Sequence, residues 1–308
     1  MNTEEQYFLG VDVGGTHLKI GLVSKSGEIV SFEKIDTAPY RDHPLGFNHC
    51  FLEGMGDILK KYPKVRKVGI GLPGLISKDR STTIEIPAIP ALNGYDLKGN
   101  LKKLYPNISF FLENDAAAAA IGEYHFGKGD TPENFIFVTM GTGIGSALVM
   151  DGQIFKGSRG NAMEMGHMLS RGNEGLETLI GRNGILKFME RFRQAYPRLA
   201  GELENQELGT HLLVDTAKNG NEVSLMVFEE VGRILGEALV STIRILDVNF
   251  VYFGGGISAG LEFMMPAMEK TVRQYLTSYY TKDLVLTKAT LENNAGTLGA
   301  AALCFMEE

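Results

Sequence analysis

The sequence is poor in cysteine and in clustered positive charge, and each shortage excludes a class of protein. Its 308 residues contain 2 cysteines, and Lys+Arg 30 against Asp+Glu 37 give a formal net charge of −7. Cys50 and Cys304 lie far apart, without metal-ligand or CxxC spacing, so we expect reduced thiols in a reducing compartment. Proteins bind the phosphate backbone of a nucleic acid through clustered Lys and Arg side chains. This acidic chain has no long basic run, so we do not expect it to bind a nucleic acid.

We also expect neither a secretory leader nor a membrane-spanning hydrophobic run. Residues 1–6 are acidic where a secretory signal would be basic and then apolar. The longest apolar stretch, Phe135–Met150, is interrupted by glycine, threonine and serine and falls short of the ~20 apolar residues of a membrane helix. We therefore expect a cytoplasmic protein without a membrane span.

Glycine, in contrast, is abundant, with 38 of 308 residues, and it clusters after β-prone runs. Two segments, one from Tyr7 and one from Phe135, share a pattern of three short strands separated by a glycine turn and a second turn. This repeat favours two related domains over a chance similarity between two hairpins. We expect strands over residues 7–13, 18–23, 28–35, 65–71, 108–112, 135–140, 145–150, 153–155, 250–253 and 284–287. We expect helices over residues 48–61, 115–124, 176–196, 210–218, 223–246, 261–279 and 295–305. The pattern predicts an α/β protein with domains at 1–120 and 121–293, and a final segment, 294–308, that packs back on the first.

The first glycine turn has the composition of a phosphate-binding loop. Gly14 and Gly15 let the backbone approach an anion and present successive N–H groups, and Thr16 adds a hydroxyl. Asp12, at the end of the strand, suits Mg²⁺ or a metal-bound water beside a phosphate. A plain hairpin turn is the alternative, although such a turn needs no acid at its mouth.

Two later glycine segments extend this pattern. The turn of Gly141, Thr142, Gly143 and Gly145 matches the first and suits the other end of a polyphosphate. The triplet Gly254, Gly255 and Gly256 follows a strand and precedes a helix, where a nucleobase and ribose can lie against bare backbone. Alone, this triplet is equally typical of a strand end; three such turns together favour a nucleotide.

Two groups of carboxylates are candidates for the chemistry. Asp115 begins an alanine-rich helix, where the helix dipole favours its ionised form, so it can take a proton from an attacking hydroxyl. An ordinary N-cap pair with Asn114 is the alternative. Glu164, His167 and Glu177 could hold sugar hydroxyls by hydrogen bonds, or they could simply belong to a solvated loop.

The chain resembles the ROK family (repressor, open reading frame, kinase), a group of sugar kinases and sugar-responsive repressors. The resemblance covers nearly the whole chain and rests on five motifs in the family's order: Asp12–Thr16, Glu113–Asp115, Gly141–Gly145, Glu164–His167 and Gly254–Gly256. It implies the actin-like, ribonuclease H-like ATPase fold with a cleft between two domains, ATP and Mg²⁺ as cofactors, and a homodimer. For the nucleotide, the resemblance implies that the first phosphate loop is formed by Asp12, Gly14, Gly15 and Thr16, with Asp12 near Mg²⁺. The second phosphate loop is then Gly141–Gly145, and adenosine lies at Gly254–Gly256. For the sugar, it implies that Asp115 is the general base and that the sugar is contacted by Asn114, Asp115, Glu164, His167 and Glu177.

The chain departs from the family in two places. The family's cysteine-rich zinc loop is missing, because residues 168–176 contain no cysteine and His167 alone cannot supply four ligands, so we predict no zinc site. Ala88 stands where the family usually has an asparagine near the sugar.

The resemblance predicts an ATP-dependent hexose kinase, with glucose, allose and N-acetylmannosamine among the candidate sugars. Two alternatives stay open. The first is a sugar-responsive regulator, which we disfavour because only 11 residues precede Asp12, too few for a DNA-binding domain. The second is a non-catalytic sugar sensor, which would be expected to lack Asp115 or the phosphate loop.

Overall fold

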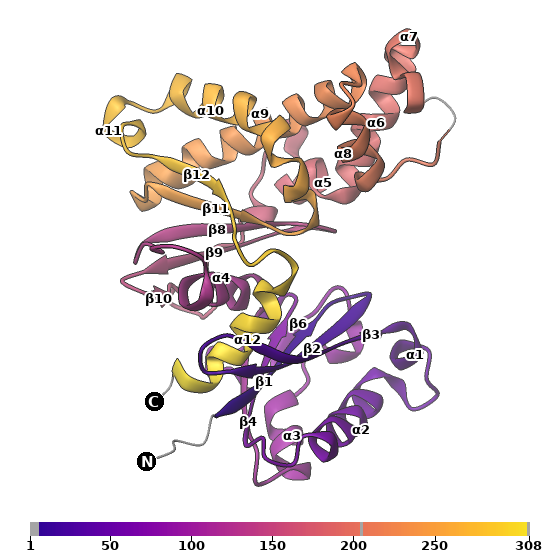
Figure 1. Ribbon diagram of the computed structural model, residues 1–308, viewed down its shortest axis with the longest axis vertical. Coiled ribbons are helices and arrows are strands. Elements are labelled where there is room, and N and C mark those ends of the chain that lie inside the picture. Colours follow the sequence, from indigo (N-terminus) through magenta and orange to yellow (C-terminus); the bar gives the residue numbers. More distant parts are fainter. Residues whose placement is uncertain (1–5, 204–205, 307–308) are drawn as a thin grey trace. The chain divides into compact units, whose positions relative to one another are not determined.

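The structure is a computed structural model that describes residues 6–203 and 206–306. It is a mixed α/β protein, as predicted (Figure 1). Its contacts divide the chain into two compact units. Unit 1 comprises Met1–Glu133, Ala147–Met163 and Asn293–Glu308, and unit 2 comprises Asn134–Ser146 and Glu164–Glu292. Residues 121–133 and 147–163, which we had assigned to the second domain, thus lie in unit 1. Because these units are defined by contacts alone, the predicted domain boundaries at 1–120 and 121–293 stay a prediction.

The strands and helices begin and end close to the predicted limits in most cases. Unit 1 contains β1 (Tyr7–Val13), β2 (His17–Ser24), β3 (Ile29–Asp36), α1 (Ala38–Arg41), α2 (Gly46–Lys61), β4 (Lys67–Leu72), β5 (Leu75–Ile76), β6 (Thr83–Glu85), η1 (Pro90–Leu92), α3 (Leu97–Leu104), β7 (Ser109–Asn114), α4 (Asp115–Phe126), β10 (Gln153–Ile154) and α12 (Ala295–Met306). Unit 2 contains β8 (Phe135–Met140), η2 (Met165–His167), η3 (Arg171–Asn173), α5 (Leu176–Ile180), α6 (Arg182–Ala195), α7 (Pro197–Ala200), η4 (Gly201–Leu203), α8 (Thr210–Lys218), α9 (Glu222–Leu246), β11 (Phe250–Gly254), η5 (Gly256–Gly260), α10 (Leu261–Tyr275), α11 (Ser278–Thr281) and β12 (Val285–Lys288). Strand β9 (Ile144–Met150) begins in unit 2 and ends in unit 1, and η6 (Glu292–Asn294) also spans the division.

Two predicted helices are wrong in their extent. The helix expected over residues 176–196 is broken at Gly181, whose φ of −69° and ψ of 173° are extended, so α5 ends there and α6 begins. The helix expected over residues 261–279 ends at Tyr275, and α11 follows as a separate turn. Helix α3 was not predicted, because its glycine and asparagine weaken its intrinsic helix propensity. Its N-cap Asp96 nevertheless accepts a hydrogen bond from Gly99 N.

Unit 1 is built on a five-stranded sheet of order β3-β2-β1-β4-β7. Strands β1, β2 and β3 form an antiparallel meander, whereas β4 and β7 run parallel to β1. Side chains alternate between the two faces of the sheet. Leu9, Val11 and Val13 belong to the same buried core as Phe47 of α2 and Leu97 of α3.

The other face of this sheet carries glycines and is covered by α12 and α4 (Figure 1). A Cβ added at Gly10 would overlap the carbonyl oxygen of Thr297 in α12, and one at Gly69 would overlap that of Ala300. Only a residue without a side chain therefore allows α12 to approach this closely. Helix α12 thus packs on this sheet within unit 1.

Unit 2 contains three parallel neighbouring strands, β8, β11 and β12, and a group of helices. Helices α9 and α10 lie side by side in Figure 1 and pack through Gly232 and Gly236 of α9. A Cβ on Gly236 would come 3.0 Å from the carbonyl oxygen of Met268, so these glycines set the spacing of the pair. Among the described residues, no helix is both long and apolar enough to cross a membrane.

Candidate active site

The first glycine turn is braced against the rest of unit 1. Gly14 N donates to His17 O at 2.9 Å and closes the turn, while the carbonyl of Gly15 accepts from Thr37 Oγ1 at 2.7 Å and from Arg41 NH1 at 3.0 Å. A Cβ added at Gly15 would lie 3.0 Å from Cβ of Ala88. Ala88, the residue that replaces the family's asparagine, thus lies beside this turn.

Asp12 is paired with a lysine that the sequence analysis missed. Its side chain is 17% exposed, and Oδ2 accepts a hydrogen bond from Lys19 Nζ at 3.0 Å. The two residues are direct neighbours across β1 and β2, because the strands pair symmetrically around the glycine turn. Because Asp12 and Lys19 lie at matching positions on either side of the predicted hairpin turn, the sequence could have predicted that they face each other.

Asn114 and Asp115 lie at the same edge of the sheet as Asp12. The register pairs Asp12 with Gly71 and Gly71 with Glu113, so the ends of three parallel strands lie level. Two strand spacings place Asp12 about 10 Å from the end of β7. Gly71 lies between them, and a Cβ added there would come 3.4 Å from Cβ of Ala118 and 3.7 Å from Cα of Asp115, so α4 packs directly over this strand.

The alternative role of Asn114 as an N-cap is observed. Its Oδ1 accepts from the backbone N–H groups of Ala116 and Ala117 at 2.9 and 3.1 Å, and its Nδ2 donates to Gly74 O at 3.2 Å. Asp115 Oδ1 accepts from Ala116 N at 2.8 Å in the first turn of α4. These bonds fix the backbone that carries the Asp115 carboxylate at a helix N-terminus, where the dipole favours its ionised form.

A buried ion-pair cluster supports this end of β7. Glu113 is 2% exposed, and Arg80 binds both of its oxygens, with Nε at 3.1 Å and NH2 at 2.9 Å. Lys156 Nζ lies 3.3 Å from Oε2, and Asn114 N donates to Oε1 at 2.9 Å. Arg80 also donates to the carbonyl of Gly160 at 2.7 Å. The cluster joins three distant segments directly before Asp115.

In unit 2, the second and third glycine segments line one pocket of ≈ 400 Å³. Gly141 and Thr142 come from the turn after β8, and Gly256, Ile257 and Ala259 come from η5 after β11. Added Cβ atoms at Gly141 and Gly256 would meet nothing within 4 Å, so the backbone at both positions is open. Gly255 has a φ of +82°, which a residue with a side chain rarely adopts.

The opposite wall of this pocket consists of residues that the sequence analysis missed. His211, Asp215 and Lys218 are exposed on α8 and, together with Val214, recur at the three- and four-residue spacing that defines one helix face. His211 is one of the residues that line the pocket. Arg182 N donates to the carbonyls of Gly141 and Thr142, both at 3.2 Å, and ties α6 to the glycine turn.

Glu164, His167 and Glu177 form a loose cluster in unit 2. His167 Nε2 lies 4.0 Å from Glu164 Oε2, and Glu177 Oε2 accepts from Ile144 N at 2.9 Å. Partial burial raises the pKa of the Glu164 carboxyl, whose side chain is 39% exposed, while His167 opposes the shift and Glu177 adds to it. Because a Cβ on Gly143 would overlap Glu177 Oε2, the glycine makes room for this carboxylate. The cluster is thus linked to the second glycine turn.

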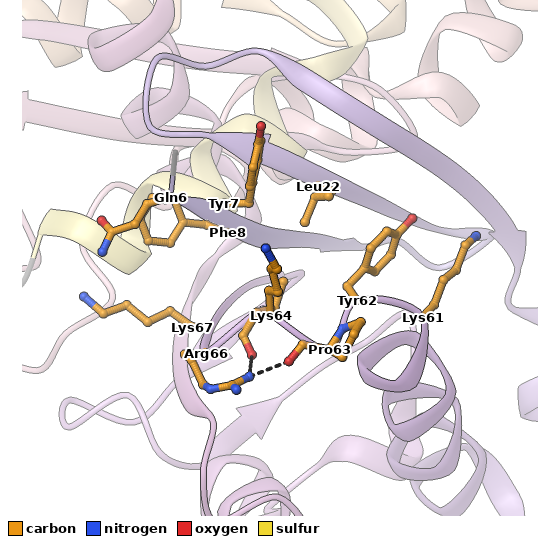
Figure 2. Close-up of a pocket in the computed structure, with 11 residues that line it drawn as sticks. Gln6, Tyr7, Phe8, Leu22, Lys61, Tyr62, Pro63, Lys64, Arg66 and Lys67 are labelled. Atoms are coloured by element: carbon orange, nitrogen blue, oxygen red, sulfur yellow. Dashed lines mark hydrogen bonds between the residues drawn. The ribbon is translucent and has the colours of Figure 1, made fainter. Parts of the chain in front are cut away.

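A larger cavity in unit 1 does not belong to this site. Its volume is ≈ 690 Å³, and Figure 2 shows Tyr7, Phe8 and Tyr62 among its lining residues. It lies at the beginning of β1, at the opposite end of the strand from Asp12. The Arg66 guanidinium there turns back to its own loop and donates to the carbonyls of Pro63 and Val65 at 2.7 and 2.9 Å.

The donor set at Asp12 suits Mg²⁺ bound together with phosphates. This ion keeps several waters and takes one or two carboxylates plus substrate oxygens, so a single partly buried carboxylate beside a glycine turn fits it. Among the residues that the structure describes, no group of three or more His, Cys, Asp or Glu side chains could hold a metal ion by itself. The prediction that the chain has no zinc site is thus compatible with the structure and stays a prediction.

Comparison with known proteins gives a consistent result over the whole chain. The model of the ROK family matches residues 8–307. A glucokinase of Thermotoga maritima is 29% identical over 319 residues, which cover 96% of this chain and 96% of that protein.

Two solved structures share the fold. A protein of Cytophaga hutchinsonii, provisionally described as a sugar kinase, has a TM-score of 0.90 and 39% identity over 97% of this chain and 99% of its own. A ROK family glucokinase of Streptomyces griseus, solved with glucose and AMPPNP, has a TM-score of 0.83 and 24% identity over 97% of this chain and 99% of its own. These neighbours confirm the predicted actin-like ATPase fold.

Proposed function

We propose that this chain, which belongs to the ROK family, is an ATP-dependent hexose kinase that transfers the γ-phosphate of ATP to a sugar hydroxyl. The observation that carries the proposal is the unit 2 pocket, where two glycine segments predicted to bind a nucleotide meet. The glucokinase relatives and the AMPPNP bound to one of them support the same assignment. Glucose is the first candidate sugar, and allose and N-acetylmannosamine are tested beside it.

Each group of residues has a distinct task in this reaction. The N–H groups of Gly14 and Gly141 already close their turns, so those of the following residues, Gly15 and Thr142, are the ones that bind phosphate oxygens. The open backbone at Gly256 receives the nucleoside. Mg²⁺, when bound, neutralises charge on the phosphates, and the Asp12 carboxylate holds it or one of its waters.

The acceptor sugar needs a base and several hydrogen-bond partners. Asp115 takes the proton of the attacking hydroxyl, since its carboxylate is held at the N-terminus of α4. Glu164, His167 and Glu177 bind other hydroxyls and thereby orient the sugar. One N–H of the Asn114 side-chain amide donates to Gly74 O, so its second N–H is the one that donates to the sugar.

The central test is the Asp115→Asn variant in a coupled ADP-release assay. We expect turnover to fall by about 10²–10⁴-fold, because loss of a general base removes an interaction of the transition state. Sugar affinity, measured by calorimetry, should change little. Asp96→Asn is the matched control, since Asp96 is likewise an aspartate at the N-terminus of a helix in unit 1 but lies outside the proposed site.

The outcomes separate the alternatives. Near-normal turnover of Asp115→Asn would contradict the assignment of the base. Wild-type protein that binds a sugar but releases no ADP with glucose, mannose, fructose, allose, N-acetylglucosamine, N-acetylmannosamine or cellobiose would instead be a sugar sensor or regulator.

A further inference from the structure

His167 lies directly before a short hairpin, residues 168–175, that returns the chain to α5. Leu169 and Gly175 form an antiparallel bridge across it. Ser170 N donates to Glu174 O at 2.8 Å, and Leu176 N donates to Met168 O at 2.9 Å. The hairpin therefore connects the Glu164–His167 segment with the helix that carries Glu177.

The tip of this hairpin has little apolar burial, although Met168 at its base is half-buried and its Sδ accepts a weak hydrogen bond from Thr242 Oγ1 of α9 at 3.9 Å. Leu169 is 79% exposed, and Asn173 and Glu174 are also exposed. Gly172 and Asn173 have φ angles of +66° and +61°, a conformation that a tight turn requires but that adds no stability of its own.

Arg171 supplies the charged attachment of the hairpin tip to α9. Its Nε donates to Glu237 Oε2 at 2.7 Å, its NH2 pairs with Glu237 Oε1, and its NH1 donates to Glu230 Oε1 at 2.8 Å. One guanidinium thus binds both oxygens of one carboxylate and one oxygen of a second. Bidentate, charge-assisted bonds of this kind are among the stronger and more directional polar contacts in proteins.

The two acceptors are placed for this contact by the geometry of α9. Glu230 and Glu237 are seven residues apart, which brings them to the same face of the helix, two turns from each other. Helix α9 is itself fixed by its packing against α10, so it offers a rigid support. The pairing with the two glutamates also raises the pKa of Arg171.

We propose that Arg171 is a positioning residue that fixes the 168–175 hairpin on α9 and so holds His167 and Glu164 in the arrangement that binds sugar hydroxyls; its effect on the sugar rests on the proposed function. Arg171 touches neither ATP nor the reacting atoms in this proposal. It acts by limiting the motion of the residues that precede it in the chain.

Three variants test this proposal. Arg171→Met removes the charge and keeps much of the side-chain length, and Arg171→Lys keeps the charge but loses the fork that binds two carboxylates. Arg233→Met is the matched control, because Arg233 pairs with the same Glu230 but from within α9, with Nε at 3.1 Å from Oε2. It loses an ion pair of the same kind and leaves the hairpin attached.

Hydrogen exchange is the first measurement because it does not depend on activity. We expect the amides of Ser170 and Leu176 to exchange about tenfold faster in Arg171→Met, less so in Arg171→Lys, and at the wild-type rate in Arg233→Met. Equal exchange in Arg171→Met and wild type would overturn the role of Arg171 in holding the hairpin.

Kinetics is the second measurement. We expect the sugar KM of Arg171→Met to rise about tenfold while the ATP KM stays within about twofold, with partial recovery in Arg171→Lys. Faster exchange without a change in sugar KM, or an equal rise in both KM values, would overturn the positioning role. If wild-type protein transfers no phosphate to any sugar, the proposed kinase function fails, and the exchange data still decide whether Arg171 holds the hairpin.

Discussion

Glu164 has an environment that shifts its titration in a defined direction. Burial raises the pKa of this carboxyl, and the neighbouring Glu177 adds to the shift, while His167 opposes it. A raised pKa means that Glu164 takes up a proton at a higher pH than an ordinary glutamate, whose pKa is about 4.3. Protonation turns one of its two acceptor oxygens into a donor and so weakens its hold on sugar hydroxyls.

We therefore expect sugar affinity to fall on acidification at a higher pH than for a glutamate with an ordinary pKa. Below the raised pKa the affinity should decrease about tenfold for each pH unit, because one ionisation is required. The measurement is the sugar KM from pH 4.5 to 8. Glu164→Gln should bind more weakly at pH 7 and lose this pH dependence, whereas Glu174→Gln, which changes an exposed carboxylate of the 168–175 hairpin, should keep it. An unchanged profile in Glu164→Gln would assign the titration to another group.

At the scale of single residues, local composition was enough for some predictions and not for others. The glycine turns and Asp12 could be predicted because the residues that form each motif are adjacent in the sequence. Lys19, Glu113 with Arg80, and Arg171 with Glu237 depend on strand register or on contacts between residues far apart in the chain, which one sequence does not reveal.

At the scale of elements, α4 and α12 show how small residues set the geometry of a layer. A Cβ added at Gly299 would overlap the carbonyl oxygen of Ala118 in α4, and one at Gly122 would come 2.5 Å from that of Ala295. The two helices therefore touch backbone to backbone. Because backbone atoms cannot move aside as a flexible side chain does, substitution here has to displace a helix.

Gly299→Ala is expected to destabilise the protein despite the better helix propensity of alanine. The propensity gain is about 1 kcal/mol, whereas overpacking of a fixed core contact costs about 1–3 kcal/mol or more. Urea denaturation gives the free energy of unfolding. Gly209→Ala is the control, because its φ is −154° and an added Cβ would meet nothing within 4 Å. A Gly299→Ala variant more stable than wild type would contradict the close packing.

The extents of most elements were predictable because hydrophobic period and glycine placement mark them directly. Strands β1 and β8 and helix α8 coincide with the residues expected. The break at Gly181 was missed because a glycine inside an amphipathic pattern is compatible with a continuous helix, and only its extended backbone shows otherwise.

At the scale of the whole molecule, the absence of a structural zinc stays a prediction that stability measurements can test. The described residues contain no set of side chains that could form a structural metal site, and the 168–175 hairpin is closed by hydrogen bonds and by Arg171.

We therefore expect a zinc chelator such as 1,10-phenanthroline to leave the Tm unchanged in the absence of nucleotide. A structural zinc would contribute several kcal/mol, so its removal would lower the Tm by many degrees. Differential scanning calorimetry with and without the chelator makes the comparison. A clear drop in Tm, reversed by added zinc, would show that a metal centre exists.

The position of α12 has a consequence for protein synthesis. The sheet that this helix covers begins with residues 7–13, whereas the helix itself is residues 295–306. On the ribosome, the part of the glycine-bearing face that α12 covers stays exposed until residues 295–306 have been synthesised. Chaperones that recognise nascent chains thus have their longest opportunity to bind at the face where the last helix will dock.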